Sequence, residues 1–98
     1  PYYRLVYVYL KNHNEALLDQ MAVVMAGKLR AVFGNRVLGP DKPPVARIQT
    51  LFIKKIVVKI EQNAPMGRAR ELLLRIQREM LADERYKSLI VYYDVDPM

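Results

Sequence analysis

The stretch at residues 37–60 reads VLGPDKPPVARIQTLFIKKIVVKI, and it constrains how the rest of the chain folds. It opens with a turn in which Pro40, Pro43 and Pro44 fix φ and donate no backbone hydrogen bond, so strand pairing is interrupted there. The residues that follow are rich in β-branched side chains, which predicts one long strand over residues 47–60.

This predicted strand has two different faces. Its even positions suit a buried face apart from one lysine: Ile48, Thr50, Phe52, Lys54, Ile56, Val58 and Ile60. Its odd positions are mixed and partly basic, as expected of a face that meets water or a partner: Arg47, Gln49, Leu51, Ile53, Lys55, Val57 and Lys59. A bulge at Lys54 and Lys55 would turn one lysine outward without ending the strand.

A strand and a helix are predicted before this stretch. Residues 3–10 are rich in tyrosine and valine, with Tyr7 and Tyr9 on one face and Val6 and Val8 on the other. Apolar residues at three- and four-residue steps then predict a helix over residues 15–33. We expect Asn14 to cap this helix, Gly34 to stop it, and Gly27 to allow a close approach to the sheet.

Three further elements complete the pattern. Residues 35–38 predict a short strand before the proline turn. After the long strand, Asn63 is a candidate cap for a second helix with Pro65 in its first turn. Alternation over residues 88–95 predicts the last strand.

The order of these elements is β-α-β-β-α-β. With right-handed crossovers it predicts an α+β fold, a ferredoxin-like two-layer sandwich: a four-stranded antiparallel sheet with two helices on one face. The length predicts a single domain over residues 1–98. We expect seven residues to lie beneath the helices, namely Val6, Val8, Phe52, Ile56, Val58, Val91 and Tyr93. The other face of the sheet stays open.

The composition limits the classes of function. The chain is 52% hydrophobic and 27% charged, which is typical of a globular domain, and no apolar run reaches the ~18 residues of a membrane span. It has no cysteine, which excludes a thiolate metal site and is compatible with the cytoplasm. The net charge of +6 favours a polyanionic partner, namely nucleic acid, an anionic membrane or an acidic peptide, although the same charge can simply keep a domain soluble. Of these partners we do not expect a membrane.

The sequence contains few residues that could form a catalytic site. His13 is the one histidine, and neither Ser88 nor Thr50 has a histidine nearby in sequence. Asp94 and Asp96 share a strand face, but two carboxylates are a weak metal signal. No phosphate-binding loop is present. We therefore expect a non-catalytic domain that holds no cofactor and no metal of its own.

The predicted open face carries the candidate nucleic-acid site. Aromatic rings stack unpaired bases and interleaved cations hold phosphates. The residues that can do so are Tyr7, Tyr9, Arg47, Lys55, Lys59 and Tyr92. The alternative is that tyrosines are common in strands and lysines keep sheet edges soluble. The third strand also lacks the signature of an RNA-recognition motif.

A protein partner is the other use of this face. Exposed aliphatic residues beside lysines suit an acidic, partly apolar peptide, and the candidate residues are Leu51, Ile53, Lys54 and Lys55. A different class of function is a regulatory or dimerising ferredoxin-like module that binds a small ligand or a second copy of itself. A small phosphatase of the acylphosphatase type ranks lower, because the loop after the first strand has no glycine nest.

Several blocks of the sequence resemble one family. They are Arg36-Val37-Leu38-Gly39-Pro40, Pro43-Pro44-Val45-Ala46-Arg47-Ile48, the opening Pro1-Tyr2-Tyr3-Arg4-Leu5 and the ending Asp94-Val95-Asp96-Pro97. Together they resemble the C-terminal domain of the PriA family of primosomal replication-restart helicases, in character its bacteroidete-like members. The resemblance extends over essentially the whole chain.

The resemblance implies a larger bacterial, cytoplasmic parent, an ATP-dependent 3′–5′ DNA helicase whose ATP site and zinc cluster lie upstream of this fragment. The missing initiator methionine agrees with an excised fragment. In the family this domain helps to bind single-stranded and branched DNA, contacts other domains of its parent, and helps to form the site for the acidic tail of single-stranded DNA-binding protein. The family's R-Y-R-x-Q pattern, which serves that tail, reads Leu51, Phe52, Ile53, Lys54 and Lys55 here.

Overall fold

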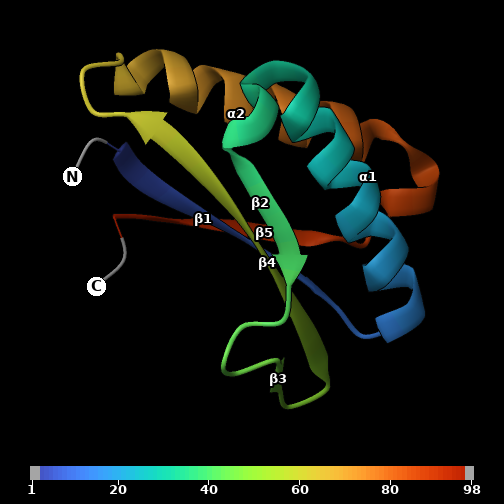
Figure 1. Cartoon of the computed structure of the whole chain (residues 1–98). Coiled ribbons are helices and arrows are strands. Elements are labelled where there is room, and N and C mark those ends of the chain that lie inside the picture. The colour runs from blue at the N-terminus through green and yellow to red at the C-terminus, as the bar shows by residue number, and fades with distance from the viewer. Residues whose placement is uncertain (1–2, 97–98) are drawn as a thin grey trace.

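The computed structural model describes residues 3–96, so that Pro1, Tyr2 and Pro97, which belong to the family resemblance, lie outside the described residues. Within this range the chain forms five strands, two α-helices and two short 3-10 helices (Figure 1). Their order is β1 (Tyr3–Asn12), α1 (Glu15–Phe33), η1 (Gly34–Arg36), β2 (Val37–Asp41), β3 (Arg47–Ile48), β4 (Leu51–Glu61), α2 (Met66–Ala82), η2 (Glu84–Tyr86) and β5 (Ile90–Val95).

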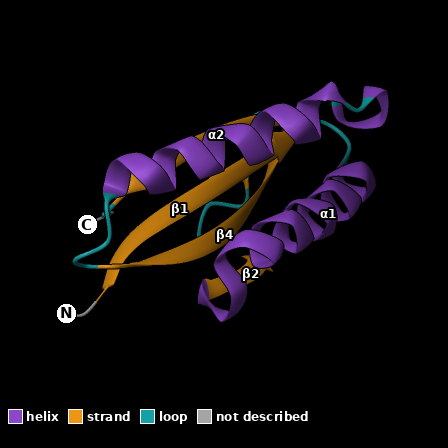
Figure 2. Cartoon of the chain, turned by 90° about the horizontal axis from the view of Figure 1, so that it is seen from above, coloured by secondary structure: helices purple, strands orange, loops and turns teal. Residues whose placement is uncertain are grey.

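The sheet is antiparallel and its strand order is β2-β4-β1-β5, with the short β3 paired to the start of β4. Both helices cover the same face, as Figure 2 shows from above, and α1 packs against β2 and β4. The predicted α+β ferredoxin-like sandwich is therefore confirmed, with β3 as an addition. Neither helix in the described part of the chain is long and apolar enough to cross a membrane.

The predicted core face is correct in register. Val6, Val8, Ile56 and Val58 are fully buried beneath the helices. The other three predicted core residues, Phe52, Val91 and Tyr93, are partly buried and pack against that core. Since a slip of one residue would have moved every one of these side chains to the open face, the alternation alone specified the faces of the strands.

The predicted continuous strand over residues 47–60 is wrong at its start. Gln49 and Thr50 form a tight turn between β3 and β4, and Gln49 adopts a positive φ of 56°. A two-residue turn with positive φ ordinarily carries glycine or asparagine, and neither residue marks the turn here. The turn also changes which residues share a face, because Arg47 now pairs with Phe52 and Ile48 with Leu51. As a result Ile48, expected to be buried, is exposed.

The predicted bulge at Lys54 and Lys55 is also wrong. The pairing of β1 with β4 runs without a shift from Tyr3 opposite Glu61 to Asn12 opposite Phe52. Lys54 therefore stays on the helix side, where its ammonium pairs with Asp19 Oδ1 of α1 at 3.1 Å. An acidic partner on the facing helix thus accommodates a lysine on the apolar face.

The register shift lies instead in β2, between Leu38 and Asp41. Gly39 sits there with a φ of 99°, and a Cβ added to it would come within 2.9 Å of the Lys55 carbonyl oxygen. Glycine is required at this position both for its left-handed backbone conformation and for the close approach of β4.

Two of the three expectations about α1 are confirmed. Asn14 Oδ1 accepts a hydrogen bond from Leu17 N at 3.0 Å, and the N–H of Gly34 donates to Arg30 O at the other end. Gly27, however, is exposed, and a Cβ added to it would meet nothing within 4 Å, so it mediates no close approach to the sheet. The cap of α2 is Pro65 and not Asn63, because the chain turns before the helix begins at Met66.

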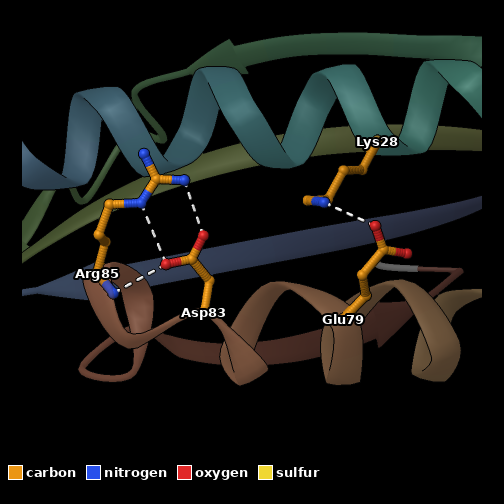
Figure 3. Close-up of polar contacts among 4 residues, drawn as sticks. All are labelled: Lys28, Glu79, Asp83 and Arg85. Atoms are coloured by element: carbon orange, nitrogen blue, oxygen red, sulfur yellow. Dashed lines mark hydrogen bonds and ion pairs between the residues drawn. The ribbon is translucent and has the colours of Figure 1, made fainter.

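Ion pairs link the helices and the segment after them (Figure 3). Lys28 Nζ of α1 lies 2.8 Å from Glu79 Oε1 of α2. At the end of α2, Asp83 accepts hydrogen bonds from the guanidinium of Arg85, at 3.1 and 2.8 Å, and from the Arg85 backbone N–H at 3.0 Å. These donors lower the pKa of Asp83 to about 2.

Candidate nucleic-acid interface

On each strand, every second residue points to the face of the sheet opposite the helices. Because Val6 pairs with Val58 on the helix side, the odd positions of β1 and β4 point to the open side. On β5 the even positions do so, since Tyr92 lies opposite Tyr9. This open face carries, among others, Tyr3, Tyr7, Tyr9, Lys11, Lys55, Lys59 and Tyr92.

Three tyrosines form a contiguous aromatic cluster on this face. The rings of Tyr9 and Tyr92 stack, with centroids 4.8 Å apart and an angle of 14° between their planes. Tyr7 meets Tyr9 edge to face at 6.2 Å. Partial burial, and secondarily the neighbouring tyrosine and Asp94, raise the pKa of Tyr9, and burial with Asp94 raises the pKa of Tyr92. Both rings therefore stay neutral at physiological pH.

Each of three lysines on this face lies over a tyrosine ring. Lys55 Nζ is 4.4 Å from the ring centroid of Tyr7, and Lys59 Nζ is 5.1 Å from that of Tyr3. Lys11 Nζ is 4.7 Å from the centroid of Tyr92. Cations and rings therefore interleave across three strands.

The open face carries carboxylates as well as these lysines, since Asp41 lies opposite Lys55 in the register of β2 and β4. Within residues 3–96, no carboxylate lies within ion-pair distance of Lys11, Lys55 or Lys59. Glu61, at the end of β4, is paired with Arg36. Asp94, opposite Tyr7, is the nearest negative charge on β5 to the tyrosine cluster. The three ammonium groups therefore remain free to meet an anionic ligand.

Five of the six predicted nucleic-acid residues lie together on this face, and the sixth does not. The β3–β4 turn places Arg47 opposite Phe52, on the helix side. There its guanidinium carbon lies 5.1 Å from the centroid of the Phe52 ring, and its Nε donates to Gln49 O at 3.1 Å. Arg47 therefore does not share a surface with Lys55 and Lys59.

Tyr3 and Lys11 belong to the open face but were not predicted. Both sit at odd positions of β1, in register with Tyr7 and Tyr9. The sequence signal was available, since the alternation that placed Tyr7 extends to both residues. Lys11 was missed because the predicted strand ended at residue 10, whereas β1 continues to Asn12. The buried Asn12 holds that end of the strand by donating through Nδ2 to Ser88 O and Oγ, both at 3.1 Å.

The four residues predicted to bind a peptide do not form one surface. Ile53 is only 3% exposed, and its backbone N–H donates a hydrogen bond to Ala46 O in the segment before β3. Lys54 lies on the helix side with Asp19. Leu51 and Lys55 are partly exposed on the open face. The expectation of exposed aliphatic residues beside two lysines is therefore wrong for Ile53 and Lys54.

The polar residues considered for catalysis are dispersed. His13 Nδ1 lies 3.1 Å from Thr50 Oγ1, a contact that their separation in sequence did not suggest. Both residues are exposed, and His13 Nδ1 also lies 3.2 Å from the Thr50 carbonyl oxygen. Asp96 is held by Arg4 at the opposite end of β1. No group of three potential metal ligands occurs in residues 3–96.

Comparison with known proteins gives information on the fold alone. No protein-family model matches the sequence, and no curated protein matches it either. Among solved structures, the chain is similar to one titled "De novo designed protein Foldit4", with a TM-score of 0.66 and 11% sequence identity over 98% of both chains. At this identity the likeness supports the two-layer architecture and says nothing of a ligand.

Proposed function

We propose that this chain is a non-catalytic domain that binds single-stranded DNA through the open face of its sheet. One observation carries the proposal: three lysines, which pair with no carboxylate in the described range 3–96, interleave with four tyrosines on a single exposed surface. Sequence-independent binding of single strands combines cations that follow the backbone with aromatic rings that stack the bases. The net charge of +6 supports the same class of partner.

The proposed parent of this domain is a replication-restart DNA helicase of bacterial cytoplasm, and the support is the sequence resemblance. In such a parent the ATP-binding and zinc-binding parts belong to other domains, and this domain contributes DNA contacts and docking surfaces. The acidic tail of single-stranded DNA-binding protein is a secondary proposed partner. Of the two lysines considered for it, Lys55 lies on the open face and Lys54 is engaged by Asp19.

The affinity that follows from this surface is modest. Three phosphate contacts on a single strand predict a log–log salt slope near ~2, since each contributes ~0.7. A lone module with few contacts also falls at the weak, non-specific end of nucleic-acid binding. The proposed role is therefore to add contacts to those of a larger assembly.

The test is a fluorescence anisotropy titration of labelled dT20 at low salt. We expect Lys55→Gln and Lys59→Gln each to weaken binding and to reduce the salt slope by somewhat under ~1. The matched controls are Arg75→Gln and Arg78→Gln on the exposed face of α2, which change the net charge equally. If the α2 variants lose binding while the lysine variants keep it, DNA binds the helical face and the proposed site is wrong.

Self-association is the second candidate function, and exposed aliphatic residues on the margins of the open face favour it. Leu38, Ile48 and Ile90 are each roughly half exposed. Two such faces brought together would also oppose their lysines, which weakens this candidate relative to nucleic acid. Sedimentation equilibrium distinguishes the two: a tight dimer that Ile90→Glu dissociates would replace DNA binding as the role of this face.

A further inference from the structure

The three lysine–tyrosine contacts divide the open face into separate platforms for bases. We infer that they form a track for four nucleotides of single-stranded DNA, in which the lysines cover the rings when no ligand is bound and move to the phosphates when it binds. This inference rests on the proposed function and specifies how many bases the site takes and where each one lies.

The number of platforms follows from which ring faces are free. Rings 4.8 Å apart leave no room for an ammonium group between them, so Lys11 covers the face of Tyr92 that points away from Tyr9. Tyr9 contacts two rings, stacking on Tyr92 and meeting Tyr7 in an edge-to-face arrangement, so we count no separate platform on it. Three rings, those of Tyr3, Tyr7 and Tyr92, each have a lysine ammonium group over one face, and we take these three faces as the platforms.

The backbone positions of these three tyrosines are unequally spaced. Tyr3 and Tyr7 are four residues apart on β1, which corresponds to about 13 Å along the strand. Tyr7 and Tyr92 are diagonal neighbours across β1 and β5, about 7–8 Å apart. A strand of evenly spaced nucleotides that places adjacent bases on Tyr92 and Tyr7 thus reaches Tyr3 two nucleotides further on. The skipped base lies over Leu5, which offers no ring.

The lysines are placed to exchange their contact with a tyrosine ring for a contact with a phosphate. Lys55 and Lys59 belong to β4, the neighbour of β1, and their ammonium groups lie over tyrosine rings of β1. A cation over an exposed ring is held more weakly than a stacked base on that ring. An arriving base therefore displaces the ammonium group, which stays within reach of the phosphate of the same nucleotide. The lysine thus shields the ring from a second copy of the chain but does not prevent a base from stacking on it.

The experiment combines NMR titration of the labelled chain with four versions of dT4, each abasic at one position. We expect one internal abasic position to be tolerated within about twofold, because its base would lie over Leu5. The other internal position and the two ends should each lose about fivefold or more, the loss of one stacked base. The tolerated internal position also reveals the direction of the strand along β1.

The lysine side chains supply an independent readout. The methylene protons next to Nζ of Lys11, Lys55 and Lys59 lie over rings, and on saturation with dT4 we expect them to move toward unshielded positions. Lys28, which is paired with Glu79 on the helical side, is the internal control and should not move. Equal losses at both internal positions, or unmoved lysine signals with dT4 bound, would overturn the four-nucleotide track and leave DNA binding in place. If neither dT4 nor dT20 binds, the proposed function itself is wrong.

Discussion

Tyr9 of β1 and Tyr92 of β5 lie directly opposite each other, and their rings stack with centroids 4.8 Å apart. The pair joins the edge strand β5 to the centre of the sheet on the face that the helices leave open. Because each ring shields the other, the cost of exposing two aromatic side chains to water is reduced. The outer ring remains 39% exposed, so Tyr92 is both held in place and accessible.

The first prediction concerns Tyr92. Replacing it by alanine removes one stacking surface and should weaken binding of single-stranded DNA by about 1–3 kcal/mol. The salt slope should not change, since no cation is lost. Anisotropy titrations over a range of salt concentrations measure both quantities. Tyr92→Phe is the matched control and should keep most of the affinity, because stacking does not need the hydroxyl. A Tyr92→Ala variant with wild-type affinity would contradict a stacked base at this ring.

The second prediction compares neighbours on β4. Ile56 is fully buried beneath the helices, and Ile56→Ala should lower the free energy of unfolding by about 2–5 kcal/mol. Val57 points to the open face, and Val57→Ala should cost about 1 kcal/mol or less, the range of intrinsic strand preference. Urea denaturation followed by circular dichroism gives both values. Equal losses at the two positions would be inconsistent with a sheet that has one covered face.

The accuracy of sequence-based prediction differed between the faces of the strands and their ends. Alternation placed Val6, Val8, Ile56 and Val58 correctly, because a buried face tolerates no other register. It failed at Arg47, where a turn with Gln49 at positive φ reverses the chain without the glycine that usually marks such a turn. One unsignalled turn was enough to move Arg47 to the opposite face and to leave Ile48 exposed.

The part of the candidate site that depends on side-chain alternation within one strand was predictable from the sequence. Tyr7, Tyr9, Lys55 and Lys59 follow from β1 and β4 alone. The environment of Lys54 did not follow, since it depends on Asp19, a residue of another element. The burial of Ile53 did not follow either, since alternation places this residue on the open face, opposite Lys11. Contacts between elements therefore set the limit of what the sequence revealed.

The third prediction uses two glycines with opposite roles. Gly39 has a φ of 99° and a neighbouring carbonyl oxygen where a Cβ would sit, so Gly39→Ala should destabilise the chain by about 1–3 kcal/mol. Gly27 lies at an exposed position inside α1 with open space around it, so Gly27→Ala should stabilise by about 0.5–1 kcal/mol. Thermal denaturation of both variants beside the parent chain measures the two shifts. A destabilising Gly27→Ala would indicate that this part of α1 has a packing partner.

The fourth prediction concerns acid. The side chain and backbone N–H of Arg85 donate to Asp83 and lower the pKa of its carboxyl to about 2, below the value of about 3.9 in an unfolded chain (Figure 3). A carboxyl whose pKa is lowered by folding stabilises the fold above its unfolded pKa. That contribution is lost as the pH falls through the folded pKa, so the window lies between about pH 4 and pH 2.

Asp83→Asn isolates this contribution, because asparagine keeps an oxygen for the Arg85 N–H but cannot ionise. We expect the variant to have a lower urea midpoint than the parent chain at pH 5, and the two midpoints to converge as the pH approaches 2. Arg85→Gln is the companion variant, which removes the guanidinium but keeps the backbone donor. Its loss of stability at pH 5 should therefore depend on pH in the same direction and be smaller than the loss in Asp83→Asn. A midpoint difference between Asp83→Asn and the parent that stays constant from pH 5 to pH 2 would show that the ionised carboxylate of Asp83 does not stabilise the fold.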